Sequence, residues 1–554
     1  MLKRSKFLRR LLGTLAVLVL LIGILFIYLA IVSRVSPPDI KDTSSLSLQR
    51  AQPDSGLYTI GNNWFRKSHS GLYELYVSGK PFERGVINGK LSEALVKTQE
   101  DYFSERINQM IPSPFYLRFL KYFIGWFNRD LSDNVTSEYK QEIYGVSQSA
   151  SDGYQYIGTK YSRILNYHSA HDIGHALQSM MLVGCTSFGT WGHASKDSTM
   201  IIGRNFDFWV GDNFAKNKIV EFVDPDVGYK FLSITWGGFI GVVSGMNEKG
   251  LTVTINAAKS DIPSEAATPV SLVAREIVQY AQNIKEAIAI ARKRKMFVSE
   301  SFLVGSAADN KAVLIEKTPD SLAIYDPNTD EILCTNHFQS NSFLHSEINK
   351  EQMAESASVY RYKRLQQLLK QGGQNTVQKT INILRDYRGL DNADIGLGNE
   401  KAVNQFIAHH SIVFEPQKLL VWVSTAPWQM GAYVCYDLKK IFSMQGLSKN
   451  QEVYEPSLTV PADSFIYTPS FKAFERYRQF KEWAFEKKQV VPDSIVADNP
   501  RLYNSYVLAG DYCLQQKQYS KAIGYYQKAI TMEIATEGER RHIEKQIELI
   551  KKQN

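Results

Sequence analysis

Cysteine is scarce in this chain of 554 residues, which contains only Cys185, Cys334, Cys435 and Cys513. Four cysteines without a regular spacing form no disulfide framework, so hydrophobic cores must hold the fold together. One sign of charge is not in large excess either, since the formal net charge is +8. No segment interleaves basic and aromatic residues, which argues against nucleic acid as a partner. The 44% hydrophobic fraction indicates a globular protein, and the length predicts about three to four domains.

Charged residues are absent from Leu11–Val32, an apolar run that follows Lys3, Arg4, Lys6, Arg9 and Arg10. At about 1.5 Å per residue, a helix of this length crosses a bilayer core of roughly 30 Å. The positive-inside rule then places the N-terminus in the cytoplasm and the chain beyond residue 36 outside. A cleaved signal peptide is the alternative, but its apolar region would be about 7–15 residues. We predict an uncleaved, single-pass anchor over residues 1–36, with Arg9-Arg10 as a basic flank rather than a twin-arginine export signal.

A metal-binding motif near residue 173 is incomplete. His171 and His175 would share a helix face and could bind a metal there. The glutamate of a zincin motif and an obvious third ligand are both missing, so we expect no metal and no cofactor. Residues 37–184 as a whole read as a mostly helical, aromatic-rich segment, for example over Tyr102–Phe127.

The stretch Gly184-Cys185-Thr186-Ser187 carries the chemistry of this chain. After a cut between Gly184 and Cys185, Cys185 would hold both a nucleophile and a base, namely its thiol and its new α-amine. An α-amine has an unperturbed pKa of roughly 7.7–8.0, which suits a base at neutral pH. A glycine before the cut leaves its carbonyl open to the Cys185 sulfur and tolerates a strained backbone. We therefore predict self-cleavage between Gly184 and Cys185.

Arg204 and Asp207 follow on a second apolar run, Gly203-Arg204-Asn205-Phe206-Asp207-Phe208. Side chains alternate along a strand, so a spacing of three places the two on opposite faces of an ideal strand. Both can face Cys185 only if the strand ends or bulges between them, and Asn205 is the expected place.

Short apolar runs separated by turn residues predict a sheet-rich region from Cys185 onward. The predicted strands are Ile201–Phe208, Lys218–Val223, Phe231–Trp236, Val242–Gly245, Leu251–Asn256, Phe302–Val304, Ala312–Glu316, Leu322–Tyr325, Ser411–Phe414, Leu419–Ser424 and Ala432–Tyr436. Apolar residues at helical spacing predict one amphipathic helix over Pro269–Lys295.

Several motifs, in this order, resemble the N-terminal-nucleophile (Ntn) hydrolases. They are Cys-Thr-Ser at 185–187, Gly-Arg-Asn-Phe-Asp at 203–207, Gly-Met-Asn-Glu-Lys-Gly-Leu at 245–251, Thr-Asn at 335–336 and Tyr-Arg-Tyr-Lys-Arg at 360–364. The resemblance is to choloylglycine hydrolase and penicillin V acylase, to acid ceramidase and its N-acylethanolamine-hydrolysing relative, and to the autoproteolytic family of isopenicillin N acyltransferase. It covers about Cys185 to Phe442, and it implies an α+β fold, the four-layer αββα sandwich.

The resemblance also implies roles for individual residues. Asn256 would contribute to the oxyanion hole, since an amide N–H stabilises the negative oxygen of a tetrahedral intermediate. Asn336 would lie at the active site, and Arg361 would support the nucleophile, although Arg361 and Arg364 could instead form a solvated helix face. Trp236, Gly237, Gly238 and Phe239 either line an acyl pocket or belong to the core.

Four parts of the chain follow from these patterns: an anchor (1–36), a helical pro-segment (37–184), a catalytic domain (185–445) and a C-terminal helical segment (455–554). Within the last part, Gly510, Ala522, Tyr526 and Ala529 match tetratricopeptide (TPR) spacing in a helical hairpin over Asn499–Ile530. One such repeat cannot bury a core alone, because about three are usually needed. It therefore packs on the catalytic domain or caps the chain, and binding a protein partner is the alternative.

The leading hypothesis is a membrane-anchored, extracytoplasmic amidase or acyltransferase in which Cys185 forms a thioester with the acyl group of its substrate. A membrane-tethered scaffold on an inactive hydrolase fold is the second hypothesis. A papain-like protease with His337 as the base is the third, and it requires no backbone cleavage. Bile-salt conjugates, N-acyl amino acids, ceramide-like lipids and penicillins all remain open as substrates, and the anchor favours lipid-like acyl chains.

Overall fold

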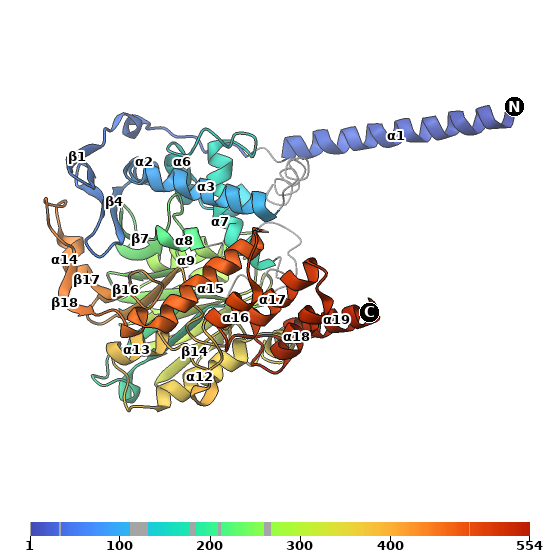
Figure 1. The fold of residues 1–554 in the computed structure, drawn as a ribbon. Helices are drawn as coiled ribbons and strands as arrows, with labels where there is room; N and C mark the ends of the chain where they lie inside the picture. The colour runs from blue at the N-terminus through green and yellow to red at the C-terminus, as the bar shows by residue number, and fades with distance from the viewer. Residues whose placement is uncertain are drawn as a thin grey trace.

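Two β-sheets form the centre of the molecule, with helices packed against both of them (Figure 1). The computed structural model describes residues 2–32, 35–110, 131–176, 184–208, 212–259, 267–486 and 488–553. A cluster of buried hydrophobic side chains joins the sheets, with Ile202 and Ile412 from one sheet and Leu232 and Leu303 from the other. The described part of the chain is therefore a mixed α and β protein, as the sequence predicted.

The larger sheet has eleven strands in the order β1-β2-β3-β4-β7-β8-β9-β10-β11-β12-β13. They are β1 (Ala51–Asp54), β2 (Leu57–Ile60), β3 (Asn63–Lys67), β4 (Tyr73–Gly79), β7 (Ile219–Pro225), β8 (Phe231–Thr235), β9 (Ser244–Asn247), β10 (Leu251–Ala257), β11 (Glu300–Ser306), β12 (Lys311–Lys317) and β13 (Leu322–Tyr325). Strands β4 and β7 pair in parallel and join two antiparallel parts. A parallel pair needs a long crossover, and here the crossover contains Cys185.

Strands β1 to β4 add a part to the segment before Cys185 that was not among the predicted elements. Strands β2 to β4 contain aromatic and β-branched residues, and Gly56, Gly61 and Gly71 adopt positive φ in the turns between the strands. Such residues favour strands and such glycines favour tight turns. Residues 37–184 are consequently not a separate helical unit, because their strands belong to the same sheet as β7 to β13.

The smaller sheet is antiparallel, with seven strands in the order β14-β5-β6-β15-β16-β17-β18. They are β14 (Glu331–Cys334), β5 (Thr186–Thr190), β6 (Ile201–Phe206), β15 (His410–Glu415), β16 (Leu420–Ser424), β17 (Tyr433–Asp437) and β18 (Tyr454–Val460). Strand β18 lies at the edge and contains Pro456, as expected for a residue that cannot donate to a ladder. The smaller sheet therefore continues past residue 445, where the predicted catalytic domain ended.

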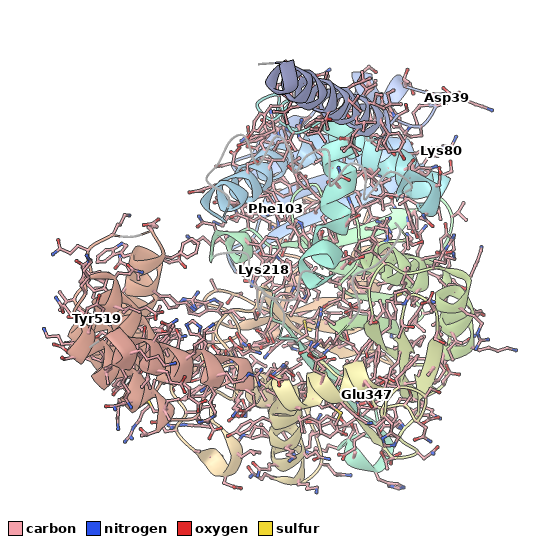
Figure 2. All side chains as sticks on the ribbon, turned by 90° about the vertical axis from the view of Figure 1, so that its right-hand side faces the viewer. Asp39, Lys80, Phe103, Lys218, Glu347 and Tyr519 are labelled. Atoms are coloured by element: carbon pink, nitrogen blue, oxygen red, sulfur yellow. The ribbon has the colours of Figure 1, made fainter. Side chains whose placement is uncertain are left out.

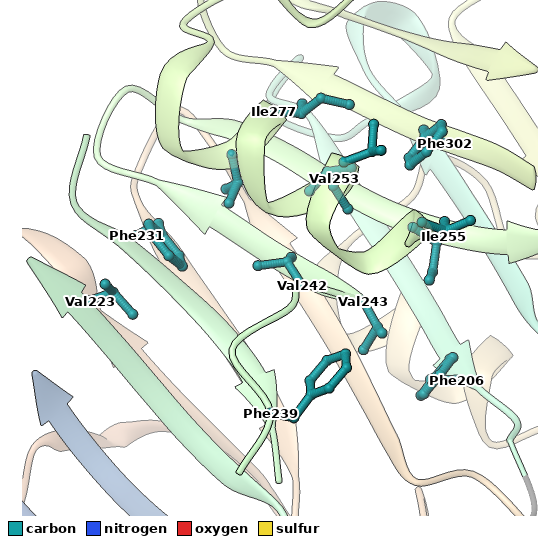
Figure 3. Close-up of a cluster of buried hydrophobic side chains, with 14 of the residues drawn as sticks. Phe206, Val223, Phe231, Phe239, Val242, Val243, Val253, Ile255, Ile277 and Phe302 are labelled. Atoms are coloured by element: carbon teal, nitrogen blue, oxygen red, sulfur yellow. The ribbon is translucent and has the colours of Figure 1, made fainter. Parts of the chain in front are cut away.

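Helices cover the outer face of each sheet. Helices α9 (Val270–Tyr280) and α10 (Ile284–Lys293) lie on the larger sheet, and Figure 3 shows Ile277 of α9 near Val253 and Phe302. The single helix predicted over Pro269–Lys295 is wrong, because the side chain of Asn283 caps a new helix by accepting from the backbone N–H of Glu286. On the smaller sheet lie α12 (Ser358–Lys370) and α13 (Val377–Leu384).

The helices before Cys185 cover one end of the larger sheet. They are α2 (Pro81–Leu91), α3 (Glu93–Met110), α5 (Leu131–Asn134), α6 (Ser137–Ser147) and α7 (Lys160–Ala176). Helices α2 and α6 approach closely through two glycines: a Cβ on Gly85 would lie 2.0 Å from the Glu142 carbonyl oxygen, and one on Gly145 would lie 2.4 Å from the Phe82 carbonyl oxygen. Three shorter helices complete the region that carries the sheets: α8 (Asp212–Lys216), α11 (Glu347–Glu355) and α14 (Leu438–Ser443).

Five helices form the C-terminal segment: α15 (Pro469–Phe485), α16 (Pro492–Asp498), α17 (Tyr503–Gln515), α18 (Tyr519–Ile530) and α19 (Glu537–Gln553). Figure 2 shows them to one side of the body, around Tyr519. Helices α17 and α18 form the predicted hairpin, and a Cβ on Gly510 would lie 2.8 Å from the Tyr526 ring. Their core also includes Phe406 and Met430 of the catalytic region, so the segment packs on that region.

Helix α1 (Leu2–Val32) extends away from the rest of the chain (Figure 1). Its window Leu11–Leu29 has a mean hydropathy of 2.8, and none of it is buried in the molecule. By length and composition this helix is a candidate membrane span or signal sequence.

Candidate active site

Cys185 lies next to one end of three neighbouring strands of the smaller sheet, β5, β6 and β15. These strand ends are called the site end of the sheet below. The register pairs Thr186 with Asn205 and Asn205 with Ser411, so the start of β5, the end of β6 and the start of β15 are neighbours. The Gly184 N–H extends this pairing by donating to the Asp207 carbonyl at 2.9 Å. Cys185 is 1% exposed and belongs to the core beneath the larger sheet. The predicted nucleophile is therefore buried at the junction of both sheets.

Strand β6 and the residue that follows it bring Arg204 and Asp207 to the site end of the sheet. Pairing is regular through Asn205 and Phe206, so β6 ends between Arg204 and Asp207, the first of the two predicted alternatives, but after Phe206 rather than at Asn205. The Arg204 Nη2 atom lies 3.6 Å from the Cys185 Sγ atom. Its guanidinium also donates to the carbonyls of Val243 and Ile255, so Arg204 reaches from the smaller sheet to the larger one.

Burial sets the protonation of the thiol and of the nearby carboxyl. It raises the pKa of Cys185 to about 11, against the opposing effect of Arg204, so the thiol is neutral at pH 7. Burial also raises the pKa of Asp207 to about 7, while Arg361 and Arg204 lower it. A neutral thiol needs a base, and a carboxyl with a pKa near 7 can serve as one at neutral pH.

Arg361 extends from α12 and contacts both residues of the predicted cleavage site, Gly184 and Cys185. Its Nη1 atom donates to the carbonyls of Gly184 and Cys185, both at 2.7 Å, and to the Thr186 Oγ1 atom at 2.9 Å. Both Arg361 and Arg364 are buried, and Arg364 pairs with Asp386, so the alternative of a solvated helix face is wrong. The guanidinium of Arg361 therefore holds the carbonyl of the bond that would be cut.

The two predicted asparagines make different contacts. Asn336 accepts from the Arg361 Nη2 atom at 2.8 Å and donates to the Ala257 carbonyl at 2.9 Å, which fixes Arg361 from behind. Asn256 accepts from the Ser187 hydroxyl at 2.8 Å and donates to the carbonyls of Cys334 and Thr335. These contacts of Asn256 thus join strands beside the site, and its oxyanion role stays a prediction.

The stretch Trp236 to Phe239 is buried in the same cluster as Cys185. The Trp236 and Phe239 rings stack with centroids 4.1 Å apart, and Phe214 meets Trp236 at 4.9 Å. A Cβ on Gly237 would lie 2.3 Å from the Leu95 carbonyl oxygen, and Gly238 adopts a φ of +83°. These four residues form packed core next to the thiol, and a role in holding an acyl chain stays a prediction.

His337 contacts residues other than the thiol. Its Nδ1 atom lies 2.8 Å from the Ser358 hydroxyl and 3.2 Å from that of Thr335. Burial lowers the pKa of His337 to about 4, so the ring is neutral. Because these contacts occupy Nδ1 away from Cys185, they argue against the papain-like pairing.

The sequence analysis did not identify several polar residues that lie at or near the site end of the smaller sheet. The Gln405 Nε2 atom donates to the Gly184 carbonyl at 2.7 Å. Behind Arg204, the Ser244 hydroxyl lies 2.8 Å from the His410 Nε2 atom, and His410 in turn lies 2.9 Å from His409. Glu300 is fully buried, and neither carboxyl oxygen has a hydrogen-bond partner within the described ranges. Adjacent histidines were the one visible signal, since Gln405 and Glu300 belong to no recognisable motif.

The described residues contain no group of three or more His, Cys, Asp or Glu side chains that could hold a metal. The side chains of His171 and His175 lie outside the described residues. Asp172 between them is buried, and its Oδ2 atom accepts from the Val270 N–H at 2.9 Å at the start of α9. The expectation of no metal therefore stays a prediction for that motif.

Comparison with known proteins shows a likeness to one family over part of the chain. Residues 194–426 match the family model of acyl-coenzyme A:6-aminopenicillanic acid acyl-transferase. An uncharacterized protein of Archaeoglobus fulgidus is 24% identical over 277 residues, which are 46% of this chain and 45% of that protein. Protein dcd1A of Dictyostelium discoideum is 21% identical over 281 residues, which are 47% of this chain and 60% of that protein. The matched part thus spans about half the length of these curated relatives.

Two kinds of solved structure are also similar to this chain. A Caenorhabditis elegans orthologue of N-acylethanolamine-hydrolyzing acid amidase is 17% identical with a TM-score of 0.30, over 42% of this chain and 93% of that one. A variant of conjugated bile acid hydrolase from Clostridium perfringens is 12% identical with a TM-score of 0.32, over 46% of this chain and 93% of that one.

The site thus combines the buried Cys185, which follows Gly184, with Arg204 and Asp207 at the end of β6. This arrangement is suited to acyl transfer through a thiol. The family match covers Arg204, Asp207, Asn256, Asn336 and Arg361 and begins shortly after Cys185. These residues therefore lie in a part of the chain that is similar to an acyl-transferase family.

Proposed function

We propose that this protein is a self-cleaving, membrane-anchored amide hydrolase or acyltransferase with Cys185 as its nucleophile. One observation carries the proposal: the Arg361 Nη1 atom donates to the Gly184 carbonyl at 2.7 Å while Arg204 lies against the Cys185 sulfur. A positive charge on the carbonyl oxygen favours attack on its carbon. The two stacked sheets with helices on their outer faces support the four-layer αββα assignment.

Self-cleavage begins when the Cys185 sulfur attacks the Gly184 carbonyl carbon. Asp207 takes the thiol proton, and the tetrahedral oxygen bears a negative charge that Arg361 stabilises. The carbon–nitrogen bond then breaks, the nitrogen takes a proton, and the Gly184 acyl group is left on the sulfur as a thioester. Water hydrolyses the thioester and frees the Gly184 carboxylate and the Cys185 thiol. The product has a new α-amine on Cys185, which the intact chain lacks.

In the mature enzyme, the α-amine of Cys185 acts as the base for its own thiol. The thiol attacks the acyl carbonyl of an amide substrate, and the amine then gives the proton to the leaving nitrogen. Water resolves the thioester in hydrolysis, and a second amine resolves it in acyl transfer. Asn256 and Arg361 supply the hydrogen bonds to the oxyanion in this proposal. The apolar cluster that includes Trp236 and Phe239 favours a substrate with an apolar acyl chain.

The location follows from α1. We assign α1 as an uncleaved anchor with residues beyond 36 outside the cytoplasm, because the basic residues precede the apolar run. Outside the cytoplasm, water is abundant and acyl-coenzyme A is not expected, so hydrolysis is favoured over transfer. A scaffold on an inactive fold is the second candidate, and the packing of the C-terminal helices on the catalytic region speaks against it.

The test is mass analysis of the purified protein. We expect wild type to yield a fragment that starts at Cys185, and hydroxylamine, which opens thioesters, to speed its formation. Cys185→Ala should abolish cleavage and amidase activity together, whereas Cys185→Ser should cleave slowly through an oxygen ester and lose most activity. An intact chain across residues 184 and 185 with full amidase activity would disprove the mechanism.

A further inference from the structure

The carbonyl of Gly184 has two hydrogen-bond donors, and the second one is Gln405. The Gln405 Nε2 atom and the Arg361 Nη1 atom both lie 2.7 Å from the Gly184 oxygen. Two donors on one carbonyl polarise it and stabilise the negative charge that develops on attack. A Cβ on Gly184 would lie 2.7 Å from the Gln405 Nε2 atom. The side chain of Gln405 therefore packs so closely against Gly184 that any other residue at position 184 would require Gln405 to move.

The residue after Gln405 is held in an uncommon backbone conformation. Phe406 has a φ of +53°, which is unfavourable for a bulky side chain and persists only where the surroundings impose it. Its carbonyl accepts from the Arg478 Nη1 atom of α15 at 2.9 Å. Its ring packs against Phe474, also of α15, with centroids 4.8 Å apart. Helix α15 therefore fixes the backbone next to Gln405.

The loop that leads to Gln405 is bound to the C-terminal helices along its length. Leu397 exchanges two hydrogen bonds with the Asn499 side chain, at 2.8 and 3.3 Å. Asn399 donates to the Glu533 carbonyl at 2.9 Å. A Cβ on Gly396 would lie 2.3 Å from the Leu502 backbone nitrogen. The loop 395–406 thus lies between the cleavage site on one side and the C-terminal helices on the other.

We propose that Gln405 is a catalytic residue of self-cleavage, as the second donor to the Gly184 oxyanion, and that the C-terminal helices position it through Arg478 and Phe406. The proposal rests on the self-cleavage proposed above. In this proposal the C-terminal helices support catalysis, because their contacts with the loop 395–406 hold the loop in place. A segment that only bound a protein partner would not need these contacts. Arg478 is a positioning residue, because it acts on the carbonyl only through Phe406 and Gln405.

The first experiment removes the donor and keeps the shape. Gln405→Met in the full-length chain should slow formation of the Cys185 fragment by about 10²-fold, the cost of losing one oxyanion donor. The rate is measured after cell-free synthesis into lipid nanodiscs, and the melting temperature of the precursor is measured alongside. A wild-type rate in Gln405→Met would overturn the catalytic role of Gln405.

The second experiment compares two arginines on the same helix. Arg478→Met removes the bond to Phe406 and should slow self-cleavage by between about tenfold and 100-fold, through displacement of Gln405. Arg476→Met is the matched control, because Arg476 pairs with Asp498 at the exposed side of α15. Equal rates for the two variants would overturn the positioning role of the C-terminal helices.

A spectroscopic measurement separates these roles from loss of folding and from cleavage itself. In Cys185→Ala, labelling glycine carbonyls with ¹³C and alanine nitrogens with ¹⁵N gives one signal for residues 184–185 and one for the natural Gly431-Ala432 pair. We expect Gln405→Met and Arg478→Met to move the Gly184 carbonyl signal upfield, as on loss of a donor, and to leave the Gly431 signal in place. Arg476→Met should move neither. An unmoved Gly184 signal in Gln405→Met would refute the inference even if wild type cleaves, whereas an uncleaved wild type would refute the proposed function instead.

Discussion

Burial raises the pKa of both acidic groups at the cleavage site. The pKa of the Cys185 thiol rises to about 11 and that of the Asp207 carboxyl to about 7, while Arg204 lies against the thiol sulfur and Arg361 donates to the Gly184 carbonyl. The site therefore combines a protonated, unreactive Cys185 thiol with the Asp207 carboxyl, which becomes a carboxylate base around pH 7. Each of these residues was visible in the sequence, but their protonation depends on burial that no local pattern reveals.

Replacing Arg361 tests the charge on the scissile carbonyl. Lysine keeps the charge but cannot donate in a fork to four acceptors at once. We expect Arg361→Lys to slow self-cleavage by about 10²–10³-fold, measured by the appearance of the Cys185 fragment. Arg364→Lys, on the same helix but paired with Asp386, is the control and should cleave much faster than Arg361→Lys.

The titration of Asp207 predicts how the cleavage rate depends on pH. Its pKa of about 7 means that the carboxylate, the proposed base, is scarce at pH 5.5 and abundant at pH 8. The rate of self-cleavage should therefore rise across this range and level off above about pH 8. Time courses at several pH values measure this, and a rate that falls with rising pH would contradict Asp207 as the base.

Buried carboxyls contribute to stability with the opposite dependence on pH. Burial raises the pKa of Glu74, Asp207 and Glu221 to about 7, above the values of about 4 expected for the unfolded chain. Between these values each of these carboxyls binds more protons in the folded state than in the unfolded state, so its contribution to the free energy of unfolding falls as pH rises. Adding Asp207→Asn to the Cys185→Ala protein removes one such contribution, so it should change the melting temperature more favourably at pH 8 than at pH 5.

At the scale of elements, the sequence predicted most strands after Cys185 but not those before it. Runs such as Leu251–Asn256 alternate between two buried faces and end at turn residues, so their strands were recognised nearly to the residue. Strands β1 to β3 have only four or five residues each, and the pair that joins this part to the rest of the sheet, β4 with β7, connects segments far apart in the chain. Gln405 was missed for the same reason, because its role comes from contacts with Gly184 and α15 rather than from its neighbours in sequence.

The close approach of α2 and α6 gives a prediction at this scale. A Cβ on Gly145 would lie 2.4 Å from the Phe82 carbonyl, so Gly145→Ala should force the helices apart and cost about 1–3 kcal/mol. Gly524→Ala is the matched control, since α18 has open space at that position and alanine favours a helix by about 0.5–1 kcal/mol over glycine. Thermal melting should show a lower midpoint for the first variant only. An unchanged midpoint in Gly145→Ala would contradict the packing described here.

At the scale of the whole molecule, α1 contributes to none of the hydrophobic cores among the described residues. No part of Leu11–Leu29 is buried in the described part of the chain, whereas the body has its own cores. We therefore expect the fold of the body to be independent of α1, the helix proposed as its attachment to a bilayer.

Deleting residues 2–34 tests this independence. We expect the shortened protein to leave the membrane fraction, to keep its melting temperature, and to cleave at the wild-type rate. Fractionation, thermal melting and mass analysis measure the three outcomes. A lower melting temperature would show that α1 also supports the body.

The parallel pair of β4 and β7 has a consequence for the cleaved protein. Fragment 1–184 would keep the anchor and β1 to β4, while the fragment with Cys185 would keep β7 to β13 and the whole smaller sheet. The nucleophile would then belong to a chain with no covalent link to the bilayer. Seven residue pairs, from Tyr73 with Ile219 to Gly79 with Pro225, would be the main-chain link within the sheet that keeps it there. Whether the active enzyme stays on the membrane or diffuses away would thus be decided by these strands and the other non-covalent contacts between the two fragments, without any further peptide bond being cut.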